Sequence, residues 1–187
     1  MNFRNVPQGA IYQRRFFLGT LFSLFLFTGM LFLSGGAEAA CTDPPGPGAD
    51  WQRCTLGCGY LDNLDLTGVN LAGARLREAS FLRASLIGAN LEGVSAHRVK
   101  FINANLSNAR LVNANLSRAD FTKANLSGAD LTGADLRNAE FYRADLTGAN
   151  LTNAQTVGAD LTRADVSGAT WTDGKRICKP GSIGRCN

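Results

Sequence analysis

The 187-residue chain contains a single histidine, His97, and few side chains suited to acid–base catalysis or metal binding. Its glycine-rich stretches lack any Gly-Lys-Ser or Gly-Lys-Thr sequence, so nothing supports a phosphate-binding loop. The length suits one domain of ordinary size and is too short for two large ones. We therefore expect a protein that is not an enzyme and needs no cofactor, and we read His97 as a solvated surface residue.

The excess of positive charge is small and unevenly placed. The formal net charge is +4, but Arg4, Arg14 and Arg15 all precede an apolar segment at the N-terminus. From Ala40 onward, 16 Lys and Arg residues stand against 14 Asp and Glu residues. The charge therefore gives no reason to expect a nucleic-acid partner.

The N-terminal segment is typical of an export signal. Phe16 to Ser34 form an uncharged, mostly apolar run of nineteen residues between Arg14-Arg15 and the small-residue site Ala37-Glu38-Ala39. This order predicts a signal peptide over residues 1–39, cleaved after Ala39, and a periplasmic or extracellular protein.

Three alternatives for this segment stay open. Arg14-Arg15 resembles the twin-arginine export motif. Nineteen apolar residues could also span a bilayer as an uncleaved inner-membrane anchor. Lipidation of Cys41 is a third route, although Glu38 stands where such signals have an apolar residue.

A period of five residues dominates the chain after a Pro- and Gly-rich linker at residues 40–48. A large apolar residue, which we call the centre, falls at every fifth position from Trp51 to Trp171, except at Ala96 and Thr156. Two positions before the centre stands a small residue, which between positions 74 and 169 is Ala in 18 of 20 cases.

Neither a helix nor a flat strand can bury this pattern on one face. Five residues turn an α-helix by about 500°, and on a strand they send successive centres to opposite faces. If each five-residue repeat forms one side of a square coil, the centre and the small residue both point inward. Four repeats then close a turn of twenty residues, which stacks Phe81, Phe101, Phe121 and Phe141 in one column.

The repeats resemble the A-[D/N]-L-x-x motif of the pentapeptide repeat family. Clean copies are Ala129-Asp130-Leu131-Thr132-Gly133 and Ala144-Asp145-Leu146-Thr147-Gly148. The resemblance implies an all-β fold, a right-handed quadrilateral β-helix of about six coils, over residues 49–173. A C-terminal cap is expected at residues 174–187.

Two features break or end the pattern. The inward positions within Val94–Lys100 depart from it together, which predicts a locally bulged turn, although two Val residues beside the undersized centre Ala96 could also conserve the interior volume. Trp51 and Trp171 are expected to cover the two ends of the coil.

The five cysteines lie near these ends, which in an exported chain indicates disulfides. Cys178 and Cys186 are expected to pair within the cap. Cys41 could pair with Cys54 or with Cys58, and one cysteine is left over.

Outward-pointing charges differ between the sides of the coil. The columns centred on Leu56 and Leu61 contain ten basic and six acidic residues, whereas those centred on Leu66 and Leu71 contain two and seven. These charges could form weak cross-coil ion pairs, such as Arg143 with the acids at positions 120, 140 and 160. Alternatively, they form a docking surface for an anionic partner. The candidate partner face comprises Arg75, Arg77, Arg98, Arg118, Arg137, Arg83, Lys123, Arg143 and Arg163.

We therefore expect a non-enzymatic exported protein, a rigid rod that presents charged faces to an envelope partner, either an anionic surface or a protein. The resemblance implies one alternative, a DNA-mimicking rod that binds type II topoisomerases. That role needs a cytoplasmic, strongly acidic rod, whereas these repeats contain 12 basic and 13 acidic residues behind an export signal. The oligomeric state stays open, and an end-to-end dimer is one option.

Overall fold

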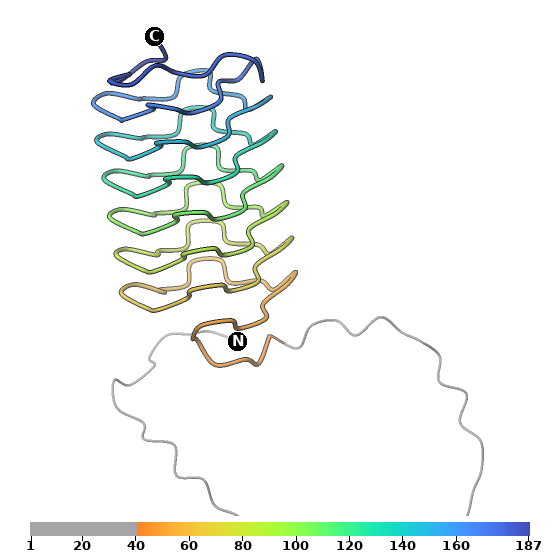
Figure 1. Cartoon of the computed structure of the whole chain (residues 1–187). Coiled ribbons are helices and arrows are strands. Elements are labelled where there is room, and N and C mark those ends of the chain that lie inside the picture. Colours follow the sequence, from red (N-terminus) through yellow and green to blue (C-terminus); the bar gives the residue numbers. More distant parts are fainter. Residues whose placement is uncertain (1–40) are drawn as a thin grey trace, which may run out of the picture.

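The computed structural model describes residues 41–187, so the predicted signal peptide at residues 1–39 lies outside the described residues. Within residues 41–187 there is no helix, and β-pairing occurs only as isolated bridges. No helix that could cross a bilayer is present in this part of the chain. Parallel bridges join residues twenty apart, from Asp50↔Asn70 to Asn150↔Thr170. Figure 1 shows the resulting stack of similar coils, with the C-terminus at one end.

Every repeat contributes one bridge, so a turn of twenty residues is paired at four places. The N–H of a centre donates to the next coil; for example, Leu131 N–H donates to Asn150 O at 2.8 Å. Neighbouring coils are therefore separated by the ordinary strand spacing of roughly 4.8 Å. The backbone pairs as in β-structure without forming extended strands, because a turn interrupts every side. The right-handed sense of the coil stays a prediction of the family resemblance.

A tight turn follows each centre and keeps each side of the coil short. The centre O accepts a hydrogen bond from the residue three positions on, as from Ala134 N–H to Leu131 O at 3.0 Å. The second residue after the centre has a positive φ in every repeat from Arg53 to Gly168. This is the left-handed position of a type II turn, which glycine adopts without strain.

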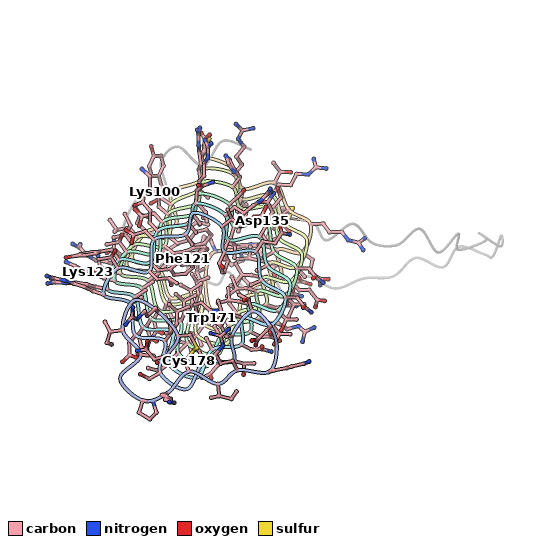
Figure 2. All side chains as sticks on the ribbon, turned by 90° about the horizontal axis from the view of Figure 1, so that it is seen from above. Lys100, Phe121, Lys123, Asp135, Trp171 and Cys178 are labelled. Atoms are coloured by element: carbon pink, nitrogen blue, oxygen red, sulfur yellow. A yellow bond between two sulfur atoms is a disulfide. The ribbon has the colours of Figure 1, made fainter. Side chains whose placement is uncertain are left out.

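The interior is packed as the period of five predicts. Centres and small residues are buried without exception from Leu66 to Leu146. The four Phe centres form one column, with ring centroids 5.1, 5.2 and 4.9 Å apart along it. Figure 2 looks down the coil and shows Phe121 pointing inward. Each buried Leu or Phe contributes roughly 1.5–3 kcal/mol to stability.

The bulged turn predicted for Val94–Lys100 is wrong. Val94, Ala96 and Val99 all point inward and are at most 1% exposed. The flanking turns keep the usual left-handed φ, 61° at Gly93 and 58° at Arg98. Two Val residues around an Ala centre replace the volume of one Leu between two Ala residues, so the backbone has no need to shift.

The first coil is closed by residues 41–50. Trp51 is 3% exposed, and its indole N–H donates to Asp43 O at 3.0 Å. A disulfide joins Cys41 to Cys54, and Cys58 is free and exposed. The cysteine with the inward position in the coil is therefore the one that pairs.

The last coil is covered in part by the C-terminal cap. Antiparallel bridges join Thr170 to Ile177 and Asp165 to Ile183. The cap also contains the Cys178–Cys186 disulfide. Trp171 is only half-buried where the coil meets the cap, in contrast to Trp51 at the other end.

The inward and outward assignments predict contrasting mutations. Leu131→Asp places a carboxylate at a fully buried position and should cost several kcal/mol, because no partner compensates the charge there. Ser127→Asp lies on the outside and should change stability by about 0.5 kcal/mol or less. Thermal melts followed by circular dichroism measure both effects, and equal melting temperatures would contradict the assignments.

Candidate functional site

No metal-binding group is found among the described residues, and His97 contacts a hydroxyl group. Among residues 41–187, no group of three or more His, Cys, Asp or Glu could hold a metal ion. His97 is half-buried on the outside of the coil, with Nδ1 2.9 Å from Ser117 Oγ on the next coil. Its partner is thus a hydroxyl that helps to join two coils.

The Asp and Asn residues before the centres stabilise turns. Asp120 Oδ1 accepts the N–H of Thr122 at 2.9 Å, and Asn125 Oδ1 accepts that of Ser127 at 2.9 Å. These are Asx turns, which amide and carboxylate oxygens form equally well. Hydrogen bonds from Thr162 lower the pKa of Asp160 below its ordinary value. Asp160 therefore serves the backbone as an anion.

Two adjacent sides of the coil, which we call the Leu56 side and the Leu61 side after their first centres, contain ten cations, and nine of these, all except Lys100, form the candidate partner face. Four of them share one position along the Leu61 side, and Figure 2 shows Lys123 of this row pointing away from the coil. Together they form the basic face: Arg75, Arg77, Arg98, Arg118, Arg137, Arg83, Lys123, Arg143 and Arg163.

Six of these nine residues occupy the left-handed turn position. A side chain at such a φ costs roughly 1–2 kcal/mol relative to glycine, because its Cβ approaches the following carbonyl. On the Leu66 side the same position is Gly in five coils and Asn108 in the sixth. Among the described residues, cations occupy this position in six of the twelve repeats of the Leu56 and Leu61 sides, in one repeat of the Leu71 side (Arg53) and in none of the Leu66 side. The six are Arg83 (φ 57°), Arg98 (58°), Arg118 (58°), Lys123 (58°), Arg143 (57°) and Arg163 (61°).

Most of the basic face is unpaired. The expected ion pairs of Arg143 with Asp120, Glu140 and Asp160 do not form: among residues 41–187 no such pair lies within 4.0 Å. The guanidinium of Arg143 instead lies over the Tyr142 ring, 5.4 Å from its centroid. The neighbouring acids are held by their own Asx turns, as at Asp120 and Asp160.

Three cations of the basic face do have acidic partners. Arg137 donates from Nε and Nη2 to the two carboxylate oxygens of Asp135, at 2.8 and 2.7 Å, and this lowers the pKa of Asp135. Arg77 and Arg98 share Glu78 at 3.5 and 3.9 Å. Of the described residues in this face, the other six have no carboxylate within 4.0 Å. They are Arg75, Arg118, Arg83, Lys123, Arg143 and Arg163.

A shallow groove of about 450 Å³ lies where the Leu56 and Leu61 sides meet, near the first coil. Tyr60 in this groove is 75% exposed. The groove combines cationic, carboxylate, hydroxyl and thiol groups, and one of its residues, Arg98, also belongs to the basic face. Its lining residues are Cys58, Tyr60, Glu78, Ser80, Arg98 and Lys100.

The family model for pentapeptide repeats matches residues 65–101, 100–138 and 139–170, more than half of the chain. The chain belongs to the pentapeptide repeat family. Members of this family are in general structural or interaction proteins. No curated protein matches the chain.

Solved pentapeptide repeat structures are similar to this chain at low sequence identity. HetL, involved in heterocyst differentiation regulation in the cyanobacterium Nostoc, is 23% identical over 69% of this chain and 83% of that chain, with a TM-score of 0.36. Rfr23 from the cyanobacterium Cyanothece 51142 is 25% identical over 66% of this chain and 88% of that chain, with a TM-score of 0.35. QnrB1, a plasmid-mediated fluoroquinolone resistance protein, is 18% identical over 68% of this chain and 84% of that chain, with a TM-score of 0.33.

Two tyrosines were missed by the sequence reasoning. Tyr142 lies beneath Arg143 and accepts a hydrogen bond from Arg163 Nη1 at 3.5 Å. Tyr60 lines the groove beside Lys100. The sequence could have predicted the contact between Tyr142 and Arg163, because these residues are 21 positions apart and therefore occupy adjacent positions on neighbouring coils.

Substitutions at the left-handed turn positions test how much strain an arginine side chain causes there. Arg143→Asn and Arg163→Asn should leave the melting temperature unchanged or raise it, because Asn occupies the same position at Asn63 and Asn103. The matched control is Gly148→Arg, at φ 65° with open space around the added Cβ. This change should cost about 1 kcal/mol. An unchanged melting temperature for Gly148→Arg would show that the strain is negligible.

Proposed function

We propose that this pentapeptide repeat protein is an exported, non-enzymatic rod whose basic face binds a linear anionic polymer of the cell envelope. The observation that most supports this is that five cations without a carboxylate partner occupy strained positions, four on the Leu61 side and Arg118 on the Leu56 side. Strain that persists at exposed positions points to a role outside stability. Since surface ion pairs contribute little, the fold itself has no need of these cations.

The periodicity of the basic face favours a linear partner. Lys123, Arg143 and Arg163 stand one coil apart, so their charges recur along the rod at the strand spacing of roughly 4.8 Å. Repeated anions of a polymer that lies along the rod can meet such a row together, which multiplies weak contacts. Away from the two ends, the exposed apolar side chains needed for insertion into a membrane are scarce on these sides.

Export is supported by both ends of the chain. The apolar run Phe16–Ser34 behind Arg14-Arg15 fits a signal sequence. The disulfides Cys41–Cys54 and Cys178–Cys186 fit an oxidising compartment, because such bonds are rare in reducing cytoplasm. The proposal therefore places the rod in the periplasm or outside the cell, and the DNA-mimic role lacks a supporting observation.

Reversal of two unpaired cations tests the basic face. Arg75→Glu with Arg118→Glu should weaken retention of the exported protein on an immobilised polyuronate at least tenfold. The matched control, Arg53→Glu with Arg110→Glu, makes the same change in net charge on the Leu71 side and should weaken retention less than twofold. Retention by the wild type should fall with added salt, because exposed charges are screened.

Two outcomes of this experiment would reject the proposal. Absence of wild-type retention at low salt would remove the polymer as partner. Equal weakening by the two double variants would show that net charge, and not the basic face, is responsible. Retention only on vesicles with anionic lipid would favour a membrane surface instead.

A fusion of the first 45 residues to an export-dependent reporter tests the localisation. Wild-type residues 1–45 should export the reporter. Replacing Arg14-Arg15 by Lys-Lys should abolish export if the twin-arginine route is used and leave it intact if the general route is used. A reporter that stays in the cytoplasm in both cases would contradict export and would revive a cytoplasmic partner.

A further inference from the structure

The groove where the Leu56 and Leu61 sides meet is lined by two rows of side chains, each with one residue per coil. The groove volume of about 450 Å³ lies within the range of small-molecule sites, roughly 300–1,000 Å³. Two coils separate the ends of each row, so the groove is about 10 Å long at the strand spacing. The first row, at the left-handed turn position of the Leu56 side, is Cys58, Glu78 and Arg98; the second, before the centres of the Leu61 side, is Tyr60, Ser80 and Lys100.

The first row places side chains where the fold favours glycine or asparagine. Its three members have φ between 56° and 59°, a conformation that is strained for a residue with a Cβ. Beyond the groove, the same column continues with Arg118 and ends in Asn138 and Gly158, and the last two residues adopt this conformation most readily. The strained part of this corner is therefore the part that borders the groove, extended by Arg118 alone.

The second row lacks a hydrogen bond that stabilises turns elsewhere in the same column. Two coils beyond Ser80, Asp120 accepts the N–H of Thr122. The side chains of Tyr60 and Lys100 cannot form such an Asx turn. Among residues 41–187, no hydrogen bond uses the N–H of the residue two positions after either of them. Both residues thus occupy their positions at the expense of stability, which points to a role in function.

The middle of the groove is hollow because Ser80 is short and is drawn to one side. Its hydroxyl donates to Asp62 Oδ1 at 2.6 Å, and the N–H of Leu82 donates to the same oxygen at 2.8 Å. Asp62, one coil lower, therefore supplies the acceptor for this turn. The space between Tyr60 and Lys100 is left open, and Figure 2 shows Lys100 on the outside of the coil.

The groups that border this space differ between its two ends. At one end, Lys100 has no carboxylate within 4.0 Å among residues 41–187, and Arg98 has only Glu78, at 3.9 Å. At the other end, Tyr60 is 75% exposed and offers an aromatic face and a phenol group. Two cations and one carboxylate give the lining a net charge of +1. It therefore suits a ligand with one negative charge, several hydroxyl groups and an apolar face.

We infer that this groove binds an acidic saccharide. The carboxylate of a uronate residue lies between Arg98 and Lys100, where two cations can bind it together. The neighbouring sugar packs the C–H face of its ring on Tyr60, and sugar hydroxyl groups donate to Glu78. The inference rests on the proposed function and deepens it, because it identifies the envelope polymer as a polysaccharide in which uronates adjoin neutral sugars.

The charge of the lining favours a carboxylated sugar over a phosphate ligand. A phosphomonoester carries a charge of about −1.5 to −2 at pH 7, which exceeds the net charge of the lining. A phosphate that is fully ionised also offers no donor to Glu78, so the two anions repel each other. A uronate brings one negative charge together with hydroxyl groups, and both signs of charge in the groove then have a partner.

Calorimetric titration of the purified protein with cellobiouronate, a disaccharide of one uronate and one neutral glucose, tests the inference. Tyr60→Ala and Lys100→Gln should each weaken binding at least tenfold. Tyr142→Ala and Lys123→Gln are matched controls on the Leu61 side outside the groove and should weaken it less than twofold. Neutral cellobiose should bind the wild type at least tenfold more weakly. Absence of binding, or equal loss in the groove and control variants, overturns the inference.

Lys100→Asn separates binding from stability. Asparagine at this position can accept the N–H of Ile102 in an Asx turn, so the melting temperature should rise by about 2 °C. Binding of cellobiouronate should nevertheless fall at least tenfold, because the ammonium group is lost. A Lys100→Asn variant that binds as the wild type does would contradict a role for Lys100 in the groove.

Alkylation of Cys58 locates the ligand, since this thiol lines the groove and is free and exposed. Saturating cellobiouronate should slow its reaction with iodoacetamide at least fivefold, and inorganic phosphate less than twofold. Equal protection by phosphate would show a general anion site and overturn the inference. Retention on a polyuronate without protection of Cys58 rejects the groove site alone. Protection without retention supports the groove site and rejects the role of the basic face.

Discussion

Backbone hydrogen bonds join residues about twenty positions apart on all four sides of this rod, and the interior must fit within the loop that they close. Coils at the strand spacing leave room for one large and one small side chain per repeat. This is why Ala stands beside nearly every Leu or Phe, and why Val94 and Val99 are accommodated only around the reduced centre Ala96. Burial of identical positions in register gives the narrow core its stability.

The same constraint leaves the outward positions free to specify function. Where Asp or Asn precedes a centre, its side-chain oxygen can stabilise the turn, as at Asp120 and Asn125. The left-handed residue after the centre tolerates several side chains at a cost in stability. Glycine minimises that cost on the Leu66 side. On the Leu56 and Leu61 sides, arginine or lysine occupies the position in six of twelve repeats, at a cost in stability that a role in binding a partner would explain.

The period of five was sufficient to predict what recurs. It placed Phe81, Phe101, Phe121 and Phe141 in one column, and the structure stacks their rings. It failed where an outcome depends on local volume or on side-chain contacts. The regular backbone at Val94–Lys100 follows from compensation of volumes, and Arg143 packs on Tyr142 because the nearby acids are already held by their own turns. Where the pairing stops was also beyond prediction, because a periodic pattern says nothing about which sides of the last coil a cap covers.

Distances between spin labels on one column test the twenty-residue coil most directly. In a Cys58→Ser background, labels at Thr67, Ser127 and Ser167 occupy the same outward position on the Leu66 side. Three coils separate Thr67 from Ser127, and five coils separate Thr67 from Ser167. The expected backbone distances are therefore about 14 Å for the first pair and about 24 Å for the second. The account predicts that the second distance exceeds the first by about 10 Å, the rise of two coils at the strand spacing. Equal distances, or a second distance shorter than the first, would contradict the stacking of residues twenty apart.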